Sequence, residues 1–328
     1  MKILLRILLV LSVLSPLPAA AAPAGSEPPQ KLVFLPHWSP QAQFAGYYMA
    51  REKGFYRQHG LDLEIVEGGP SRSAVEYLRH RRADIVSLWL SSALQLADEG
   101  MDIVNVGQII QRSALVLVTK KSSGITTPKQ MQGVKVALWP ADFQIQPKAF
   151  FHRFGVSNRI VTTANPVNLF LRDGVEVASV MWYNEYHTLL NSGLDPEEMQ
   201  LFFFDDFGLN FPEDGIYLRR ETLDREPAAV RAFVAATLEG WDYAFAHPEE
   251  AIDLVMAEMA KARVPANRVH QRWMLARMRD LFATGNTPPL QLDADDYRQV
   301  GEIMQAAGLI RAIPDHSSFF QDVLDHAR

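Results

Sequence analysis

The first third of the chain alternates between short apolar runs and longer stretches with a helical spacing of apolar side chains. Runs typical of buried strands occur at 31–35, 61–66 and 83–88. Between them, 41–58 and 73–82 have the spacing of amphipathic helices, and Ser73 with Glu76 forms a capping-box pattern at the start of the second. Strands that alternate with helices predict a largely parallel sheet with right-handed crossovers.

A second set of alternating patterns begins after residue 112. Strand-like runs occur at 113–119, 134–138, 159–163, 176–181 and 199–204. Helix-like segments fall between them at 128–132, 142–154, 167–171 and 184–190. We interpret this region as a second, smaller α/β unit inserted into the first, because a strand-like pattern returns at 215–218.

The last third of the chain is helical by the same criterion. Apolar residues recur on one face of a helix predicted over 227–246. Further helices are expected at 249–261, 266–282 and 293–307, with a short one after Ser317. The pattern as a whole predicts an α/β fold of two lobes, with a hinged cleft and a helical tail. We expect lobe 1 to comprise 31–116 and 215–328, and lobe 2 to comprise 117–214.

Residues 1–21 have the pattern of a signal peptide. Lys2 and Arg6 precede a short apolar stretch, and Ala19-Ala20-Ala21 fits the small-residue cleavage rule. A membrane anchor needs about 20 apolar residues, whereas this stretch ends at Pro16. We therefore expect export to the periplasm of a Gram-negative cell, as a soluble protein without a lipid anchor.

Composition narrows the chemistry that the chain can perform. Its 328 residues include 38 acidic and 32 basic side chains, which argues against a nucleic-acid partner. The absence of cysteine excludes thiolate catalysis, disulfides, cysteine-ligated zinc or iron–sulfur groups and lipidation at an N-terminal cysteine. No H-E-x-x-H, G-x-S-x-G or P-loop pattern occurs. We expect no cofactor, no metal and no enzyme activity.

Four of the six tryptophans follow predicted strands at their carboxyl ends, namely Trp38, Trp89, Trp139 and Trp182. Ligands of open α/β sheets bind outside these ends, where the connectivity switches. The alternative is that the tryptophans close the hydrophobic layer of each lobe, because large aromatic side chains are buried wherever they fall. Four in this position favour a cleft with aromatic walls, which suits a planar ligand.

Polar residues gather at the same strand ends and at the second crossing, namely Gln43, Ser91, Ser92, Asn184, Glu185 and Asp214. Glu185 could accept two parallel hydrogen bonds from an amidine-like edge. The alternatives are that the serines cap a helix and that Glu185 is a solvated first-turn acid. Gly68-Gly69-Pro70-Ser71 fits either a tight turn or an anion cradle.

The segment WSPQAQFAGYYMAREKGFY, from Trp38 to Tyr56, resembles the ABC-transporter substrate-binding proteins related to the thiamine-pyrimidine-precursor and alkanesulfonate binders. Similarity over about 31–260 also includes Gly60-Leu61-Asp62, Tyr183-Asn184-Glu185, Glu213-Asp214-Gly215-Ile216, Gly240-Trp241 and Pro248-Glu249-Glu250-Ala251. The resemblance implies a type 2 periplasmic binding fold that docks with a membrane permease. For members that carry pyrimidines, it implies Trp38, Tyr47 and Glu185 as ligand contacts, with Asn184 and Asp214 as weaker candidates.

Three functions remain open from the sequence. The first is a monomeric periplasmic binding protein of an ABC importer, which closes on a small planar nitrogen heterocycle, most plausibly a thiamine pyrimidine precursor. The second is a periplasmic sensing module that presents its closed form to a membrane histidine kinase. The third is a pyrimidine-forming enzyme, although the eukaryotic enzymes of this resemblance bear a cysteine-rich iron motif and this chain has no cysteine.

Overall fold

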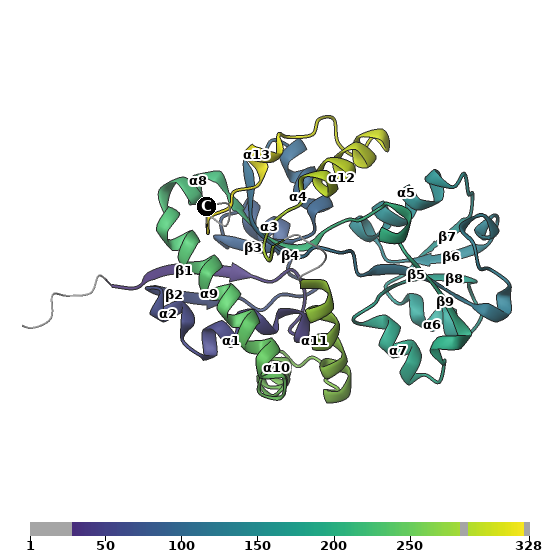
Figure 1. The fold of residues 1–328 in the computed structure, drawn as a ribbon, viewed down its shortest axis with the longest axis horizontal. Helices are drawn as coiled ribbons and strands as arrows, with labels where there is room; N and C mark the ends of the chain where they lie inside the picture. The colour runs from purple at the N-terminus through teal and green to yellow at the C-terminus, as the bar shows by residue number, and fades with distance from the viewer. Residues whose placement is uncertain (1–27, 283–287, 325–328) are drawn as a thin grey trace, which may run out of the picture.

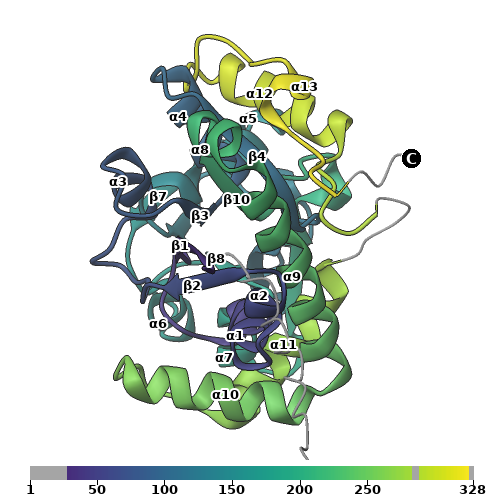
Figure 2. The ribbon, with the colours of Figure 1, turned by 90° about the vertical axis from the view of Figure 1, so that its left-hand side faces the viewer.

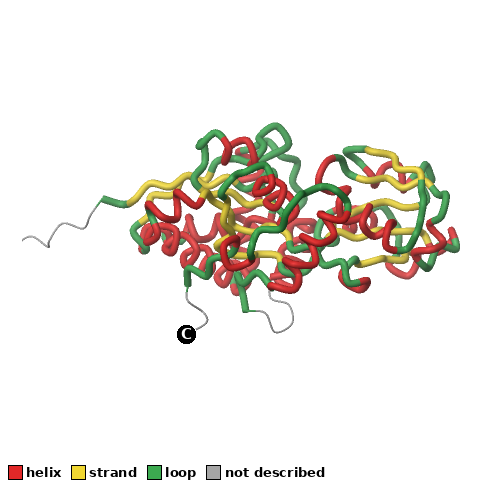
Figure 3. The backbone as a smooth tube through the Cα atoms, turned by 90° about the horizontal axis from the view of Figure 1, so that it is seen from above, coloured by secondary structure: helices red, strands yellow, loops and turns green. Residues whose placement is uncertain are grey.

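The computed structural model describes residues 28–282 and 288–324, which form two α/β lobes (Figure 1). The signal peptide predicted at 1–21 lies outside the described residues. Among the helices of the described ranges, none has the length and apolarity that a bilayer crossing requires. Seen from above, the two bodies lie side by side and are joined by a narrower waist (Figure 3).

Each lobe is built on a five-stranded sheet. The lobe 1 sheet has the order β2-β1-β3-β10-β4 and comprises β1 (Gln30–Leu35), β2 (Leu61–Ile65), β3 (Ile85–Leu88), β4 (Ile103–Ile110) and β10 (Glu213–Arg219). The lobe 2 sheet has the order β7-β6-β8-β5-β9 and comprises β5 (Leu115–Lys120), β6 (Lys135–Leu138), β7 (Arg159–Thr162), β8 (Val177–Met181) and β9 (Met199–Phe203).

One strand in each sheet runs against the other four. β10 is antiparallel to β3 and β4, and β5 is antiparallel to β8 and β9. Both follow a crossing between the lobes, so each enters its sheet from the cleft while its neighbours end there. The sheets are therefore largely parallel, as predicted, because four strands of each share one direction. Each is nevertheless a mixed sheet, because its fifth strand pairs antiparallel with both neighbours. The carboxyl ends of eight strands and the first residues of β5 and β10 consequently meet at the cleft.

Helices cover both faces of the lobe 1 sheet (Figure 2). One face carries α1 (Ala45–Glu52), α2 (Phe55–Gln58), α9 (Pro227–Ala246), α10 (Pro248–Lys261) and α11 (Arg268–Phe282). The other carries α3 (Ala74–Arg79), α4 (Leu90–Asp98), α12 (Ala294–Ala306) and α13 (His316–Phe319), and α8 (Arg220–Arg225) follows β10. Adjacent strand residues such as Phe34 and Leu35 therefore serve opposite cores.

Lobe 2 has fewer and shorter helices. Its sheet is covered by α5 (Ile145–Arg153) on one face and by α6 (Pro166–Leu171) and α7 (Glu185–Asn191) on the other. Short 3₁₀ turns complete the connections of both lobes. One lies in lobe 1, at Ala42–Phe44, and the others lie in lobe 2, at Lys121–Ser123, Pro128–Met131, Ala141–Gln144, Pro196–Glu198 and Asp205–Phe207.

Three sequence expectations differ from the structure. The helix expected over 41–58 is broken at Gly54, whose φ of 75° only glycine adopts readily. β4 was not anticipated, because Asn105, Gly107 and Gln108 interrupt its apolar run, although all eight of its residues are buried. The lobe boundaries shift by a few residues, since all of β5 pairs in lobe 2 and all of β10 pairs in lobe 1. The crossings therefore lie before Leu115 and before Glu213.

The longest helix packs against the first helix through two glycines. A Cβ at Gly46 would lie 2.3 Å from the Trp241 ring, and a Cβ at Gly240 would lie 2.2 Å from the Gly46 carbonyl oxygen and 2.6 Å from the Ala50 Cβ. Only hydrogen fits at either position, so α1 and α9 approach closely and Trp241 is completely buried.

Replacing Gly240 with alanine should therefore lower the free energy of unfolding by about 1–3 kcal/mol, despite the better helix propensity of alanine. Thermal denaturation followed by circular dichroism measures the effect. Gly301→Ala in α12 is the control, because the atoms nearest to its added Cβ, at 2.7 Å and beyond, belong to the Ile313 side chain in a loop rather than to backbone. Equal stability of wild type and Gly240→Ala would contradict the close-packing account.

Candidate ligand-binding site

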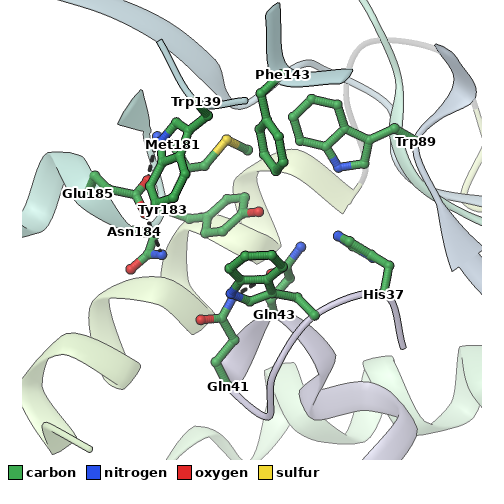
Figure 4. Close-up of a pocket in the computed structure, with 11 residues that line it drawn as sticks. His37, Gln41, Gln43, Trp89, Trp139, Phe143, Met181, Tyr183, Asn184 and Glu185 are labelled. Carbon is green, nitrogen blue, oxygen red and sulfur yellow. Dashed lines mark hydrogen bonds between the residues drawn. The ribbon is translucent and has the colours of Figure 1, made fainter. Parts of the chain in front are cut away.

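Residues from both lobes enclose a pocket at the carboxyl ends of the strands (Figure 4). Lobe 1 contributes the loop after β1 and the residue after β3, and lobe 2 contributes the loops after β6 and β8. The lining residues are His37, Trp38, Gln41, Gln43, Trp89, Trp139, Phe143, Met181, Tyr183, Asn184 and Glu185. This is the interlobe position that the strand-end argument predicts.

Aromatic rings from the two lobes meet inside the pocket. Phe143 of lobe 2 packs edge-to-face on Trp89 of lobe 1, with ring centroids 4.5 Å apart, and lies 6.0 Å from Trp139. The remaining free volume is about 30 Å³, close to one water's share of the liquid. Small-molecule sites are usually about 300–1,000 Å³. Admission of a ligand therefore requires the lobes to separate or Phe143 to move.

A half-buried carboxyl group, that of Glu185, forms the polar wall of lobe 2. Glu185 begins α7, and its two oxygens accept hydrogen bonds from the Met181 amide at 2.8 Å and from Asn184 Nδ2 at 2.9 Å. Burial raises the pKa of Glu185 to about 7, against the lowering effect of the backbone hydrogen bonds. Each carboxylate oxygen keeps a further lone pair for a ligand.

A second carboxyl group, which is buried, supports the wall of lobe 1. Asp214 Oδ2 accepts a hydrogen bond of 2.6 Å from Gln43 Nε2, and Oδ1 lies 3.5 Å from His37 Nε2. Burial raises the pKa of Asp214 and lowers that of His37, and the charges of the two groups oppose both shifts. Asp214 also has a φ of 56°, a conformation that non-glycine residues adopt at an energetic cost. The hydrogen bond from Gln43 helps to hold the backbone at the start of β10 in this conformation.

The preceding residue, Glu213, joins the two crossings. Its Oε1 accepts hydrogen bonds from Ser113 Oγ at 2.8 Å, from the Ala114 amide at 2.9 Å and from the Leu115 amide at 3.3 Å. The side chain is fully buried. Burial, and next the charge of Asp214, raise the pKa of Glu213 to about 8.

The structure brings most of the predicted site residues together. Trp38, Gln43, Trp89, Trp139, Asn184 and Glu185 line the pocket. Asp214 lies directly behind Gln43, and Ser92 lines an adjoining groove that shares Trp38, Trp89 and Phe143 with the pocket. Whether these residues contact a ligand remains a prediction.

Three further predicted residues also lie outside the pocket. Tyr47 is in the lobe 1 core between Phe34, Phe233 and Trp241, because its position on α1 faces the sheet. Ser91 is buried in the first turn of α4. Trp182 packs on Phe203 and beneath the Arg277 guanidinium. It is the first residue after β8, and its side chain points away from the pocket that its neighbours Met181 and Tyr183 line.

Sequence reasoning missed Gln41, Phe143, Met181 and Tyr183 as site residues, and noted His37 only as a neighbour of the cleft. Phe143 lies in a 3₁₀ turn inside a segment that was expected to be helix, so its strand-end position was not visible. Met181 ends β8 and Tyr183 precedes Asn184. Because neighbouring side chains along an extended chain point to opposite sides, Met181 and Tyr183 could have been predicted to share the side opposite to Trp182.

The glycine pair before α3 forms a tight turn. The Arg72 amide donates to the Gly69 carbonyl at 2.9 Å, and a Cβ at Gly68 would lie 2.1 Å from the Pro36 carbonyl oxygen. This packing accounts for the glycines without an anion. Within the described ranges, no group of three or more His, Asp or Glu side chains is placed to hold a metal ion.

Comparison with known protein families identifies the family of this chain. The model of the family described as "NMT1/THI5 like" matches residues 41–251, which is more than half of the chain. The chain belongs to the NMT1/THI5-like family. This membership confirms the family resemblance predicted from the segment that begins at Trp38.

Relatives of this NMT1/THI5-like chain include binding proteins and enzymes. A putative thiamine biosynthesis protein of Haemophilus influenzae is 25% identical over 86% of this chain and 88% of its own length. The riboflavin-binding protein RibY of Chloroflexus aurantiacus is 25% identical over 97% and 94%. A 4-amino-5-hydroxymethyl-2-methylpyrimidine phosphate synthase of Saccharomyces cerevisiae is 22% identical over 67% and 69%.

Among solved structures, the periplasmic aliphatic sulphonate binding protein SsuA of Escherichia coli matches with a TM-score of 0.68 and 16% identity, over 90% of this chain and 92% of that chain. This NMT1/THI5-like chain therefore has the two-lobed α/β fold of a type 2 periplasmic binding protein, as predicted.

The raised pKa of Glu213 makes stability depend on pH in a defined direction. A carboxyl group that binds its proton more tightly in the folded state loses stabilisation as pH rises from about 4.5 to 8. In Glu213→Gln, the free energy of unfolding should fall by about 1–3 kcal/mol less than in the wild type over this pH range. Denaturant unfolding at several pH values measures it, with the exposed Glu64→Gln as control. Identical pH profiles of wild type and Glu213→Gln would refute the assignment.

Proposed function

We propose that the chain is the periplasmic solute-binding component of an ABC importer, which captures a planar nitrogen heterocycle between its lobes. A thiamine pyrimidine precursor is the class of ligand that we favour. The single observation that carries the proposal is that indole rings from both lobes line one interlobe pocket beside the half-buried carboxyl group of Glu185.

The pocket supplies both interactions that such a ligand needs. Trp38, Trp89 and Trp139 provide aromatic surfaces, and offset stacking on each adds about 0.5–1.5 kcal/mol beyond burial. The Glu185 carboxylate can accept hydrogen bonds from an aminopyrimidine edge, and the Gln41, Gln43 and Asn184 amides provide donors and acceptors. A bare nitrate or sulfonate would use neither the rings nor the carboxylate. Relatives associated with thiamine and riboflavin support the same ligand class.

The mechanism is a shift between open and closed arrangements. A ligand that contacts both walls binds the closed form better and raises its population, which a permease then recognises. No bond is broken. The yeast synthase among the relatives makes an enzyme the second candidate, and turnover of the proposed ligand would favour it.

Titration with 4-amino-5-hydroxymethyl-2-methylpyrimidine and with riboflavin tests the proposal. Isothermal calorimetry should detect one site for at least one of these compounds, and none for taurine or nitrate. Trp139→Ala should weaken binding by about tenfold or more, because it removes a stacking surface and its burial. Trp182→Phe is the matched control, since Trp182 lies outside the pocket. No heat with any heterocycle would overturn the ligand class.

Glu185 gives a separate prediction. Glu185→Gln keeps the shape of the side chain but removes its charge, so affinity for the aminopyrimidine should fall by about tenfold at pH 8. The wild type should also bind more weakly as pH falls below about 7, where Glu185 becomes protonated. The glutamine variant should lack this step. An unchanged step in Glu185→Gln would remove Glu185 from the proposed site.

A further inference from the structure

A pair of histidines joins the lobes beside the pocket. His187 lies on α7 of lobe 2 and His270 on α11 of lobe 1, and their Nδ1 atoms are 2.9 Å apart. His187 also stacks on Trp273 of α11, with ring centroids 4.9 Å apart and planes inclined by 15°. Trp273 Nε1 donates to the Trp182 carbonyl oxygen at 3.3 Å. α11 is itself anchored in lobe 1, where buried Gln271 accepts from the Ala42 amide at 2.7 Å.

A chain of hydrogen bonds connects this pair to the pocket carboxylate. Because the ionised Glu185 carboxylate only accepts, Asn184 presents Nδ2 to it and turns Oδ1 towards His270. His270 Nε2 lies 2.7 Å from that oxygen and must carry a proton. The other ring nitrogen of a neutral His270 is then an acceptor, so His187 donates from Nδ1. The Asn191 side-chain amide lies 3.1 Å from the same His187 nitrogen, and with this assignment it presents its oxygen there. The ionised Glu185 thus fixes which ring nitrogens carry protons, through hydrogen bonds that run from Glu185 to Asn184, then to His270 and finally to His187.

We propose that His270 is a positioning residue that fixes the orientation of Asn184 and Glu185 in the pocket wall, and that its contact with His187 latches the lobes in the closed arrangement. The inference rests on the proposed function only in treating this wall as the ligand site. The latch itself is a contact between lobes and can be tested without a ligand.

The latch requires a neutral His270 ring. If His270 also gains a proton on Nδ1, two N–H groups face each other and the hydrogen bond is lost. Burial, and next the charge of His187, lower the pKa of His270 to about 4, and burial lowers the pKa of His187. In the open arrangement the His270 ring meets solvent and its pKa returns towards about 6.5. Closure is therefore fully supported above about pH 6.5 and is progressively lost as pH falls towards 4.

The surrounding charges are largely paired among themselves. On α11, Arg268 and Arg272 form ion pairs with Glu249 of α10, Arg268 also pairs with Asp253, and Arg277 pairs with Asp280. On α7, Glu185 is the acidic group that faces the latch, and it titrates near pH 7. A variant that removes only the His270 titration therefore separates the two effects.

Spin labels report the lobe separation directly. The chain has no native cysteine, so Ser71→Cys and Ala164→Cys place one label on an exposed residue at the cleft-facing end of each lobe. Double electron–electron resonance should show a short distance at pH 7.5 without ligand. At pH 5.0 the ratio of closed to open forms should fall by about tenfold.

Variants of both histidines complete the test. His270→Ala should show the longer distance already at pH 7.5 and little further change at pH 5.0. His187→Asn keeps a donor at the Nδ1 position and should stay closed at pH 7.5. The exposed His80→Gln is the control and should match the wild type at both pH values. Distances in His270→Ala that equal those of the wild type at both pH values would overturn the latch, as would opening of His187→Asn at pH 7.5 with its near-ultraviolet circular dichroism intact.

Binding measurements separate positioning from closure. His270→Gln retains a donor for Asn184, so it should bind 4-amino-5-hydroxymethyl-2-methylpyrimidine more tightly than His270→Ala does. Equal affinities of the two variants would refute the positioning role. If the wild type binds neither this pyrimidine nor riboflavin but its lobe distance changes with pH as described, the proposed function fails and the latch stands.

Discussion

One buried carboxyl group, that of Glu213, holds together the two places where the chain passes between lobes. Its oxygen accepts from three donors at the start of β5, while Glu213 itself begins β10. Asn210 adds to the same junction, accepting from the Ser113 amide at 2.8 Å and donating to the Gln111 carbonyl oxygen at 2.8 Å. The two reversed strands therefore start side by side, and the orientation of both sheets towards the cleft follows from that junction.

The cleft that results is closed largely by aromatic contact. Phe143 and Trp89 meet across it, and little free volume remains. The contact buries apolar surface without directional hydrogen bonds, so separation of the two rings breaks no hydrogen bond. The polar residues beneath these rings are already hydrogen-bonded to one another, so the walls are organised before a ligand arrives.

On one side of the cleft the helical tail adds a second connection between the lobes. α11 belongs to lobe 1 by its packing, yet His270 and Trp273 contact α7 of lobe 2. Hydrogen bonds across a lobe interface are worth little in water and more where burial excludes it. Such contacts tune the balance between open and closed forms without being part of the hinge.

The sequence by itself determined most of the elements and the family. Helices α9–α12 were predicted within one or two residues, since amphipathic periodicity is a local property, and Ser73 caps α3 as its pattern with Glu76 predicts. Strand-end position also brought Trp38, Trp89 and Trp139 to one pocket. The tertiary structure alone decided that Trp182 and Tyr47 turn away, that buried β4 completes a sheet, and that His187 meets His270. These outcomes depend on which faces of distant segments pack together, and a one-dimensional pattern does not contain that information.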